Sequence, residues 1–212
     1  MLKLKIFTFN PFQVNTYLVY NEAGDCMLFD AACQTSEEKE TLINYIEENK
    51  LKISGIYSTH GHIDHIMGNK FLHDKTNAPI YMHQEDLFLV KTGVEHAMMF
   101  GLRVESPPVP ENFLAEKDKI LKEDIMTSVL HLPGHSPGSI GFYFENEKFI
   151  ILGDVLFNGS IGRTDLPGGD YNTLVNSIKS KLFPLGDDVV VYCGHGPATT
   201  IGDEKRNNPF LS

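Results

Sequence analysis

The sequence predicts an α/β fold with four layers, in the order helix, sheet, sheet and helix. Two observations support this prediction. Short apolar segments of strand length alternate with amphipathic helical patterns, and each half of the chain reads as strands followed by a helix. The chain has 212 residues, which is enough to bury a substantial core. We find no convincing internal repeat, and we expect a single domain spanning residues 1–212.

The N-terminal part of the chain is predicted to form a β-meander followed by a helix. Leu2, Leu4 and Ile6 alternate with lysines, as in a strand with one solvated face. Thr35 and Glu38 have the spacing of a capping box, and apolar residues then recur at helical intervals. The elements expected here are strands at 2–6, 16–20, 26–29 and 51–58 and a helix at 36–49.

The rest of the chain continues this alternation, apart from one irregular segment. Residues 106–110 read Ser-Pro-Pro-Val-Pro, which cannot form a helix interior, so residues 93–119 are predicted to be a surface excursion. Asp170 can cap a helix whose buried face includes Leu174 and Ile178. The other expected elements are helices at 66–73 and 84–91 and strands at 79–82, 125–132, 140–144, 148–152 and 189–193.

Composition restricts the classes of partner and the compartment. A formal net charge of −10 repels polyanions at long range, so DNA and RNA are not expected partners. Cys26, Cys33 and Cys193 form no disulfide or metal-binding pattern, as expected for buried or free thiols in a reducing compartment. The sequence shows no signal peptide and no stretch of transmembrane length. We expect a cytoplasmic protein that acts on a small molecule, and no sequence feature indicates its oligomeric state.

Four potential metal ligands lie within six residues directly after the strand predicted over 51–58. The segment reads His60-Gly61-His62-Ile63-Asp64-His65. In an extended segment residues i and i+2 point the same way, so His60 and His62 can bind one ion. A turn into a helix would redirect Asp64 and His65 towards a second ion. A polar loop of hydrogen-bonded histidines is the alternative, and this density of ligands after an apolar strand makes it the weaker one.

Three further residues share the position of His60 in the predicted fold. His135, Asp154 and His195 each lie just beyond the carboxyl end of an apolar strand, with a glycine beside them. Residues at equivalent strand ends converge on one rim of a sheet, where α/β folds place their sites. Taken alone, Asp154 could be a helix cap and His195 an ordinary loop residue. Together with the histidine cluster, they predict a metal centre.

A centre of five histidines and two aspartates suits zinc or another borderline first-row metal. One carboxylate could bridge two ions, and a water held there would have its pKa lowered to about 7 and supply a metal-bound hydroxide. The second ion would stabilise the oxyanion of a reacting carbonyl. No Gly-x-Ser-x-Gly nucleophile elbow competes with this chemistry. The sequence therefore predicts a metal-dependent hydrolase in which Asp64 and Asp154 have catalytic roles.

These residues resemble the signature of the metallo-β-lactamase superfamily, and the resemblance extends from about Phe7 to His195. It implies an αβ/βα sandwich and a centre of two divalent ions, with zinc as the expected metal and iron or manganese as alternatives. It also implies a role for each ligand: His60, His62 and His135 on the first ion, Asp64, His65 and His195 on the second, and Asp154 as the bridge.

Within that superfamily the chain is most similar to short, single-domain glyoxalase II-like hydrolases. The segments that carry this similarity are 133–139, 153–165, 194–197 and 208–211. Glyoxalase II hydrolyses S-D-lactoylglutathione, so the resemblance implies thioester hydrolysis. Full-length glyoxalase II holds glutathione with a C-terminal helical domain, and the sequence here reaches only to Ser212, so the resemblance does not extend to glutathione specificity. Arg163 is the candidate for binding a substrate carboxylate, and a structural ion pair with Asp165 is the alternative.

Other functions would use the same residues. The first alternative is an oxidoreductase similar to persulfide dioxygenases, with one iron on His60, His135 and Asp154. A lactonase or β-lactamase would use the same hydrolytic chemistry, whereas the acidity of the chain disfavours a nuclease. A metal-binding scaffold without activity is the non-enzymatic alternative, although all seven ligands are present.

Several other residues of reactive or apolar type are expected to have ordinary structural roles. The histidines outside the pattern are interpreted as surface or core residues: His73, His83, His96 and His131. Met98, Met99 and Phe100 could line a substrate groove, and core packing is the favoured interpretation.

Overall fold

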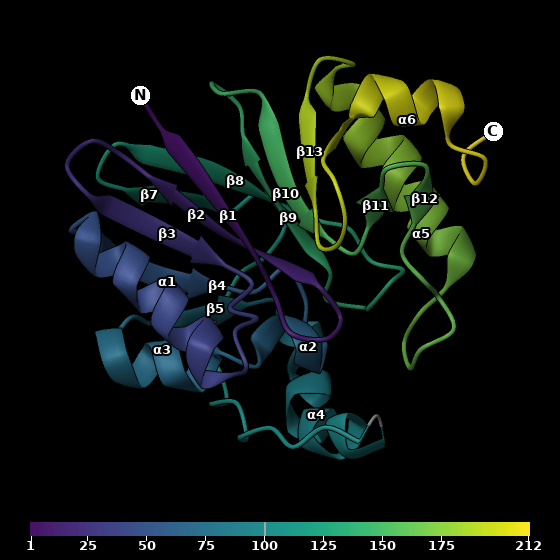
Figure 1. The fold of residues 1–212 in the computed structure, drawn as a ribbon. Helices are drawn as coiled ribbons and strands as arrows, with labels where there is room; N and C mark the ends of the chain where they lie inside the picture. Colours follow the sequence, from purple (N-terminus) through teal and green to yellow (C-terminus); the bar gives the residue numbers. More distant parts are fainter. Residues whose placement is uncertain (100) are drawn as a thin grey trace.

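Two six-stranded sheets pack face to face, and helices cover the outer face of each (Figure 1). The computed structural model describes residues 1–99 and 101–212. The layers follow one another as helix, sheet, sheet and helix, as the sequence predicts. The chain passes from the first sheet to the second in the middle of the sequence, so each half of the chain supplies one sheet and its helices (Figure 1).

The first sheet is formed by the N-terminal half of the chain. Its first three strands pair antiparallel, and the later ones join in parallel through helical crossovers. Helices α1 (Ser36–Glu48) and α3 (Asn69–Thr76) cover its outer face, and their Leu42 and Leu72 belong to the same buried cluster as Leu28 of the sheet. The strands, in order across the sheet, are β1 (Lys3–Phe9), β2 (Val14–Tyr20), β3 (Asp25–Phe29), β4 (Lys52–Tyr57), β5 (Ile80–Met82) and β6 (Asn112–Phe113).

The second sheet is formed by the C-terminal half. Helices α5 (Tyr171–Ser177) and α6 (Ile201–Asn207) cover it, and a π-helical turn at Ile178–Leu182 extends α5. A short hairpin of β11 (Leu156–Phe157) and β12 (Ser160–Ile161) forms a separate two-stranded sheet. The strands, in order across the main sheet, are β14 (Thr199–Thr200), β13 (Val190–Cys193), β10 (Phe149–Gly153), β9 (Ile140–Phe144), β8 (Ile125–His131) and β7 (Lys119–Lys122).

Aromatic side chains fill the space between the two sheets. Phe29 and Tyr57 of the first sheet are buried against Phe142 and Phe144 of the second. The ring centroids of Phe29 and Phe142 lie 4.8 Å apart, within the usual range for aromatic pairs. These contacts hold the sheets together just behind the strand ends that carry the histidines and aspartates.

The capping box predicted for α1 is present. The Thr35 side chain accepts a hydrogen bond from the Glu38 backbone, and Glu38 Oε2 accepts one from the Thr35 backbone. Glu38 also accepts hydrogen bonds from the backbone of Asn10, in the turn after β1, and of Gln34. The helix start is therefore tied to the turn that leads into β2.

Replacing Thr35 with alanine should lower the free energy of unfolding by about 1 kcal/mol, because one backbone N–H of α1 loses its partner. Urea unfolding followed by circular dichroism measures this change. Ser36→Ala is the matched control, since Ser36 is exposed and lies one residue further on. We expect the control to change the unfolding free energy by less than about 0.5 kcal/mol. Equal effects in the two variants would contradict the capping role.

Two of the predicted helices differ from the observed ones. Instead of one helix over 66–73, the chain forms α2 (Ile63–Ile66) and α3, which are separated at Gly68. The Gly68 backbone N–H donates to the Ala31 carbonyl at 2.7 Å instead of to the preceding helical turn, so the break follows from a tertiary contact. A Cβ at Gly68 would lie 2.6 Å from Cys33 Sγ, so this approach needs a glycine. The helix predicted over 84–91 is a 3₁₀ turn, η1 (Gln84–Asp86), followed by the longer α4 (Leu87–Met99). Part of the predicted surface excursion is therefore helical.

The prediction that Met98 and Met99 pack in the core is wrong. Met98 is 67% exposed and Met99 is 82% exposed, whereas Phe100 lies outside the described residues. The three cysteines are free and buried, as predicted. Among the described residues, no helix has the length and apolar character needed to cross a bilayer.

Candidate metal centre

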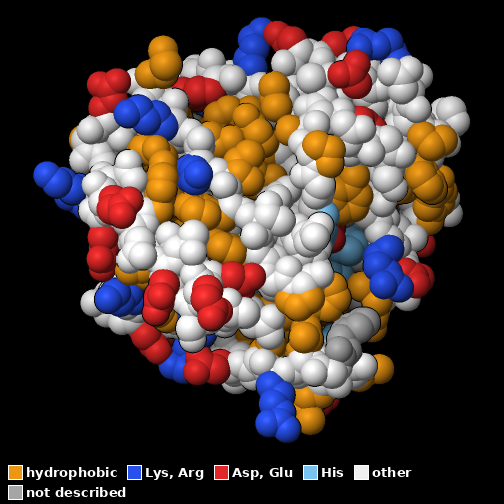
Figure 2. Space-filling model, in the orientation of Figure 1, with side chains coloured by type: hydrophobic (Ala, Val, Ile, Leu, Met, Phe, Trp, Pro, Cys, Tyr) orange, Lys and Arg blue, Asp and Glu red, His pale blue; other side chains and the backbone are white. Residues whose placement is uncertain are grey.

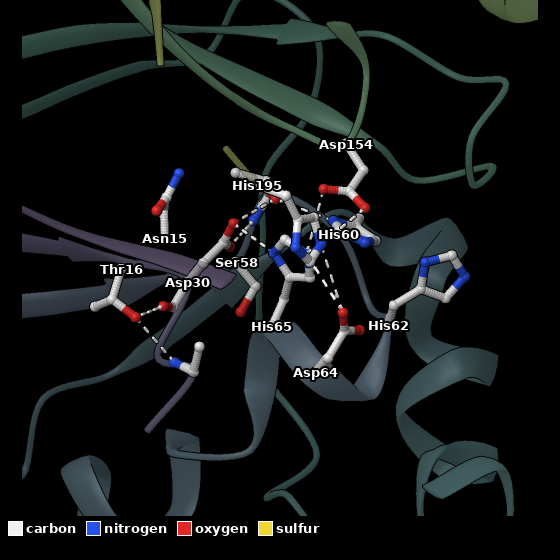
Figure 3. A network of polar contacts seen from close by, with 12 residues as sticks. Asn15, Thr16, Asp30, Ser58, His60, His62, Asp64, His65, Asp154 and His195 are labelled. Atoms are coloured by element: carbon white, nitrogen blue, oxygen red, sulfur yellow. Dashed lines mark hydrogen bonds and ion pairs between the residues drawn. The ribbon is translucent and has the colours of Figure 1, made fainter. Parts of the chain in front are cut away.

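The seven predicted ligands converge at one rim of the sandwich, where the strands of both sheets end. His60 follows β4 and the next three ligands lie at the start of α2, whereas His135, Asp154 and His195 follow β8, β10 and β13. Figure 3 shows Asp154 and His195 facing the side chains of His60, Asp64 and His65. The two halves of the chain thus bring their ligands to one place.

His60, His62 and His135 form a first cluster, with one potential ligand atom of each lying within 4.8 Å of the others. His135 Nε2 lies 3.3 Å from His60 Nε2 and 2.9 Å from His62 Nδ1. His60 and His135 are buried, and their rings meet edge to face. Three nitrogens that face one another in this way could bind a single cation.

A second cluster consists of Asp64, His65 and His195. Here too, one potential ligand atom of each residue lies within 4.8 Å of the others. His65 Nε2 lies 3.4 Å from His195 Nε2 and 3.9 Å from Asp64 Oδ2. His195 Nε2 lies 3.7 Å from the same carboxylate oxygen. His65 is fully buried, whereas Asp64 and His195 are partly exposed.

The Asp154 carboxylate lies against both clusters. Its Oδ1 is 3.3 Å from His65 Nε2, and its Oδ2 is 3.4 Å from His195 Nε2 and 3.7 Å from His135 Nε2. Asp154 Oδ1 is also buried and has no hydrogen-bond partner among the described residues. A buried carboxylate oxygen without such a partner fits coordination to a cation.

The protonation states favoured at this site are those of metal ligands. Burial and the nearby His65 and His62 hold the pKa of His60 well below its usual range, and burial together with His135 lowers the pKa of His62 to about 3. Burial would raise the pKa of Asp154, but His65 and His195 overcome it and keep that pKa well below normal. His60 and His62 are therefore neutral and Asp154 is ionised at neutral pH, as cation binding requires.

The pKa of His65 is shifted in the opposite direction to those of His60 and His62. Burial would lower its pKa, but Asp154, Asp30 and Asp64 together raise it well above the usual value. The surrounding carboxylates thus favour a positive charge at this point of the site, whether it is carried by a proton or by a metal ion.

A second layer of acceptors orients three of the imidazoles. His135 Nδ1 donates to the Arg163 carbonyl at 2.8 Å, and His195 Nδ1 donates to the Phe12 carbonyl at 2.8 Å. His65 Nδ1 contacts the Asp30 carboxylate at 2.9 Å. Carbonyl oxygens can only accept, so Nδ1 of His135 and of His195 carries a proton, and Nε2 is the nitrogen of each ring that faces the clusters. Hydrogen bonds of this kind fix the tautomer and ring orientation of metal-ligating histidines.

Glycines beside the ligands permit a very close approach of the chain. Gly153 has φ +55°, and a Cβ there would lie 2.1 Å from Thr59 Oγ1. A Cβ at Gly194 would lie 2.1 Å from Asp154 Oδ1. The glycines that mark the predicted strand ends are therefore required by the packing of the site itself.

Sequence reasoning gave no functional role to two buried aspartates. Asp30 accepts hydrogen bonds from the backbone and hydroxyl of Thr59 and contacts His65. It directly follows β3, and this strand-end position was an available signal. Asp86 accepts hydrogen bonds from Gly61 N, Gly138 N and Ser136 Oγ, and so joins the loop of His60 to the loop of His135. No sequence pattern distinguishes Asp86 from an ordinary helix-start residue.

A pocket of about 420 Å³ opens over the clusters. Figure 2 shows histidine side chains at the bottom of a hollow that hydrophobic side chains border. Arg163 lines the pocket, and its guanidinium also makes two hydrogen bonds of 2.7 Å to Asp165, so the two interpretations of Arg163 are compatible. His96 also lines the pocket, a position that the sequence did not indicate. The apolar part of the wall consists of Phe12, Ile63, Met99, Leu166 and Pro167.

Comparison with known proteins agrees with this architecture. A family model described as "Metallo-beta-lactamase superfamily" matches residues 9–195. The chain is 40% identical to the hydroxyacylglutathione hydrolase GloC of Haemophilus influenzae, over 100% of this chain and 99% of that protein. Two solved structures are also similar. BLEG-1 B3 metallo-beta-lactamase has a TM-score of 0.91 and 34% identity, with 99% of this chain and 100% of that chain covered.

The second structure is TTHA1623 in a di-iron-bound form, with a TM-score of 0.89 and 38% identity over 98% of this chain and 100% of that one. Fold, clustered ligands and the extent of the family match all lead to one assignment. This chain belongs to the metallo-β-lactamase superfamily, whose fold implies divalent metal binding.

Proposed function

We propose that the protein hydrolyses acyl thioesters of the glyoxalase II type, in a single domain spanning residues 1–212. The observation that carries the proposal is the position of the Asp154 carboxylate, which lies within 3.7 Å of nitrogens in both clusters. A carboxylate so placed suits a bridge between two divalent ions. The proposed ligands are those inferred from the sequence: His60, His62, Asp64, His65, His135, Asp154 and His195.

The donor set suits a borderline first-row metal. Five imidazoles and two carboxylates favour zinc, while the di-iron-bound neighbour supports iron and leaves manganese as a further alternative. When bound, two such ions lower the pKa of water to about 7 and polarise a carbonyl oxygen. The surrounding residues set the protonation of the proposed ligands. His135 and His195 keep their protons on Nδ1, and Asp154 stays ionised.

The pocket supports a small acyl substrate. Its apolar wall excludes water from the reacting carbonyl, and Arg163 at its edge could bind a substrate carboxylate. The GloC relative is named as a hydroxyacylglutathione hydrolase, and the full-length similarity to it favours a thioester. The similarity to a B3 metallo-beta-lactamase favours β-lactam hydrolysis as a second candidate with the same chemistry.

Metal analysis combined with a substrate panel tests the proposal. The chain is loaded separately with zinc, iron or manganese and assayed on S-D-lactoylglutathione, a simple acyl thioester, a lactone and a cephalosporin. We expect two ions per chain at the seven proposed ligands and the highest kcat/KM on a thioester, with activity lost on chelation and restored by metal. One iron per chain, with oxygen uptake on glutathione persulfide, would instead indicate a dioxygenase. No turnover in the full panel would leave only a metal-binding role.

Replacing Arg163 with glutamine should raise KM for a carboxylate-bearing thioester by about 10-fold or more, because a charged hydrogen bond to the substrate is lost. The kcat value should change much less, since Arg163 lies outside both clusters. Lys148→Gln is the matched control, because Lys148 forms a similar exposed ion pair, with Asp188, and does not line the pocket. An unchanged KM in Arg163→Gln would show that the arginine only pairs with Asp165.

A further inference from the structure

A second group of potential ligands lies outside the candidate metal centre. His83 follows β5 of the first sheet, Glu85 lies in the η1 turn, and His131 ends β8 of the second sheet. One ligand atom from each of these side chains lies within 4.8 Å of the others. None of the three residues touches the seven ligands of the main centre in the described contacts. We propose that His83, Glu85 and His131 form an accessory site for a zinc-type divalent cation.

The contacts within this group favour a cation. Glu85 Oε2 lies 3.7 Å from His131 Nε2, and the two imidazole rings stack with centroids 4.1 Å apart. The three side chains thus bring two imidazoles and one carboxylate together, a ligand set that zinc accepts with water in the fourth position. All three are partly or largely exposed, so an ion can reach them from solvent.

His131 already has the outer hydrogen bond expected of a ligating histidine. Its Nε2 lies 2.8 Å from the Pro137 carbonyl oxygen, which can only accept, so Nε2 carries the proton and Nδ1 is the nitrogen left to bind an ion. The 3.7 Å contact with Glu85 is made by the same Nε2 and is a charge contact, so the exposed Glu85 side chain would turn towards Nδ1 when the ion binds. The ring is held in this state before any ion binds. His83 Nδ1 accepts a hydrogen bond from the Glu85 backbone at 3.3 Å, a long contact that costs little to exchange for a ligand bond.

An ion at this position would connect the two sheets close to the main centre. His83 and Glu85 belong to the segment that continues into Asp86, and His131 contacts the loop that carries His135. Asp86 already joins these segments through its hydrogen bonds to Gly61, Ser136 and Gly138. An accessory cation would hold the same two segments from the solvent side and so stabilise the folded chain.

Zinc stoichiometry tests this site independently of activity. The full chain, without an affinity tag, is equilibrated in a buffer of fixed free Zn²⁺, and zinc per chain is measured by elemental analysis. We expect wild type to bind one more ion than Glu85→Gln or His131→Gln. Glu95→Gln is the matched control, because Glu95 is exposed on α4 and lies outside the group. The control should bind as many ions as wild type.

Thermal unfolding provides a second measurement, since an ion that binds only the native state raises Tm. With the main centre saturated, further Zn²⁺ should raise the Tm of wild type and of Glu95→Gln, and should leave Tm unchanged in Glu85→Gln and His131→Gln. Equal zinc content in wild type and Glu85→Gln would overturn the proposal. So would loss of the extra ion in Glu95→Gln, because that result would indicate non-specific binding.

Discussion

Asp154→Ala should lower kcat/KM by more than about 100-fold, which exceeds the cost of changing a group that only supports a ligand. Metal content should fall in parallel, because both clusters lose the carboxylate that lies between them. Without Asp154, His65 and His195 also lose the negative charge that lies nearest their Nε2 atoms. Elemental analysis and steady-state kinetics on the best thioester measure the two effects.

The fold should survive this change. The Asp154 side chain accepts no hydrogen bond from the backbone in the described contacts, and the aromatic core between the sheets lies behind it. Circular dichroism and the unfolding midpoint of the metal-free protein should therefore stay near those of wild type. Asp188→Ala serves as a control, since this exposed aspartate pairs with Lys148 at the surface. Wild-type turnover in metal-loaded Asp154→Ala would refute the bridging role.

The convergence of the seven proposed ligands was predictable because each of the four loops that carry them starts at a strand end. An apolar strand followed by glycine and a polar ligand is a local pattern, and parallel or neighbouring strands bring such ends to the same rim. The spacing of His60, His62, Asp64 and His65 adds a second local signal. Both signals depend on residues close in sequence, so no knowledge of the tertiary contacts was needed.

The features that escaped prediction depend on contacts between distant segments. The break between α2 and α3 at Gly68 follows from its approach to Ala31 and Cys33, more than thirty residues earlier. The strands β6, β11, β12 and β14 contain only two residues each, too few to show a period. Met98 and Met99 follow the apolar pattern of a buried helix end, yet Met99 lies at the pocket. A hydrophobic pattern alone does not distinguish a core from the wall of a binding site.

Asp30→Asn should weaken metal binding at the cluster of Asp64, His65 and His195 by about 10–100-fold, although it changes no proposed ligand. Asp30 is fully buried and has φ 51°, a conformation that asparagine tolerates well. The substitution keeps the size of the side chain and replaces one acceptor oxygen with an N–H donor. The backbone N–H of Thr59 can only donate, so the amide oxygen must stay on that side, where the wild-type carboxylate oxygen lies 2.7 Å from it.

In the Asp30→Asn variant, the new amide nitrogen would then face His65 Nδ1, where the wild-type carboxylate oxygen lies at 2.9 Å. It would donate to Nδ1 and move the imidazole proton to Nε2, the atom that faces Asp154 and Asp64. A protonated Nε2 cannot bind a metal, so the variant should retain the ion of the His60 cluster and lose the other at limiting metal. Asp25→Asn, at the opposite end of β3, should bind both ions normally. Equal metal affinities in Asp30→Asn and wild type would show that Asp30 does not set the tautomer of His65.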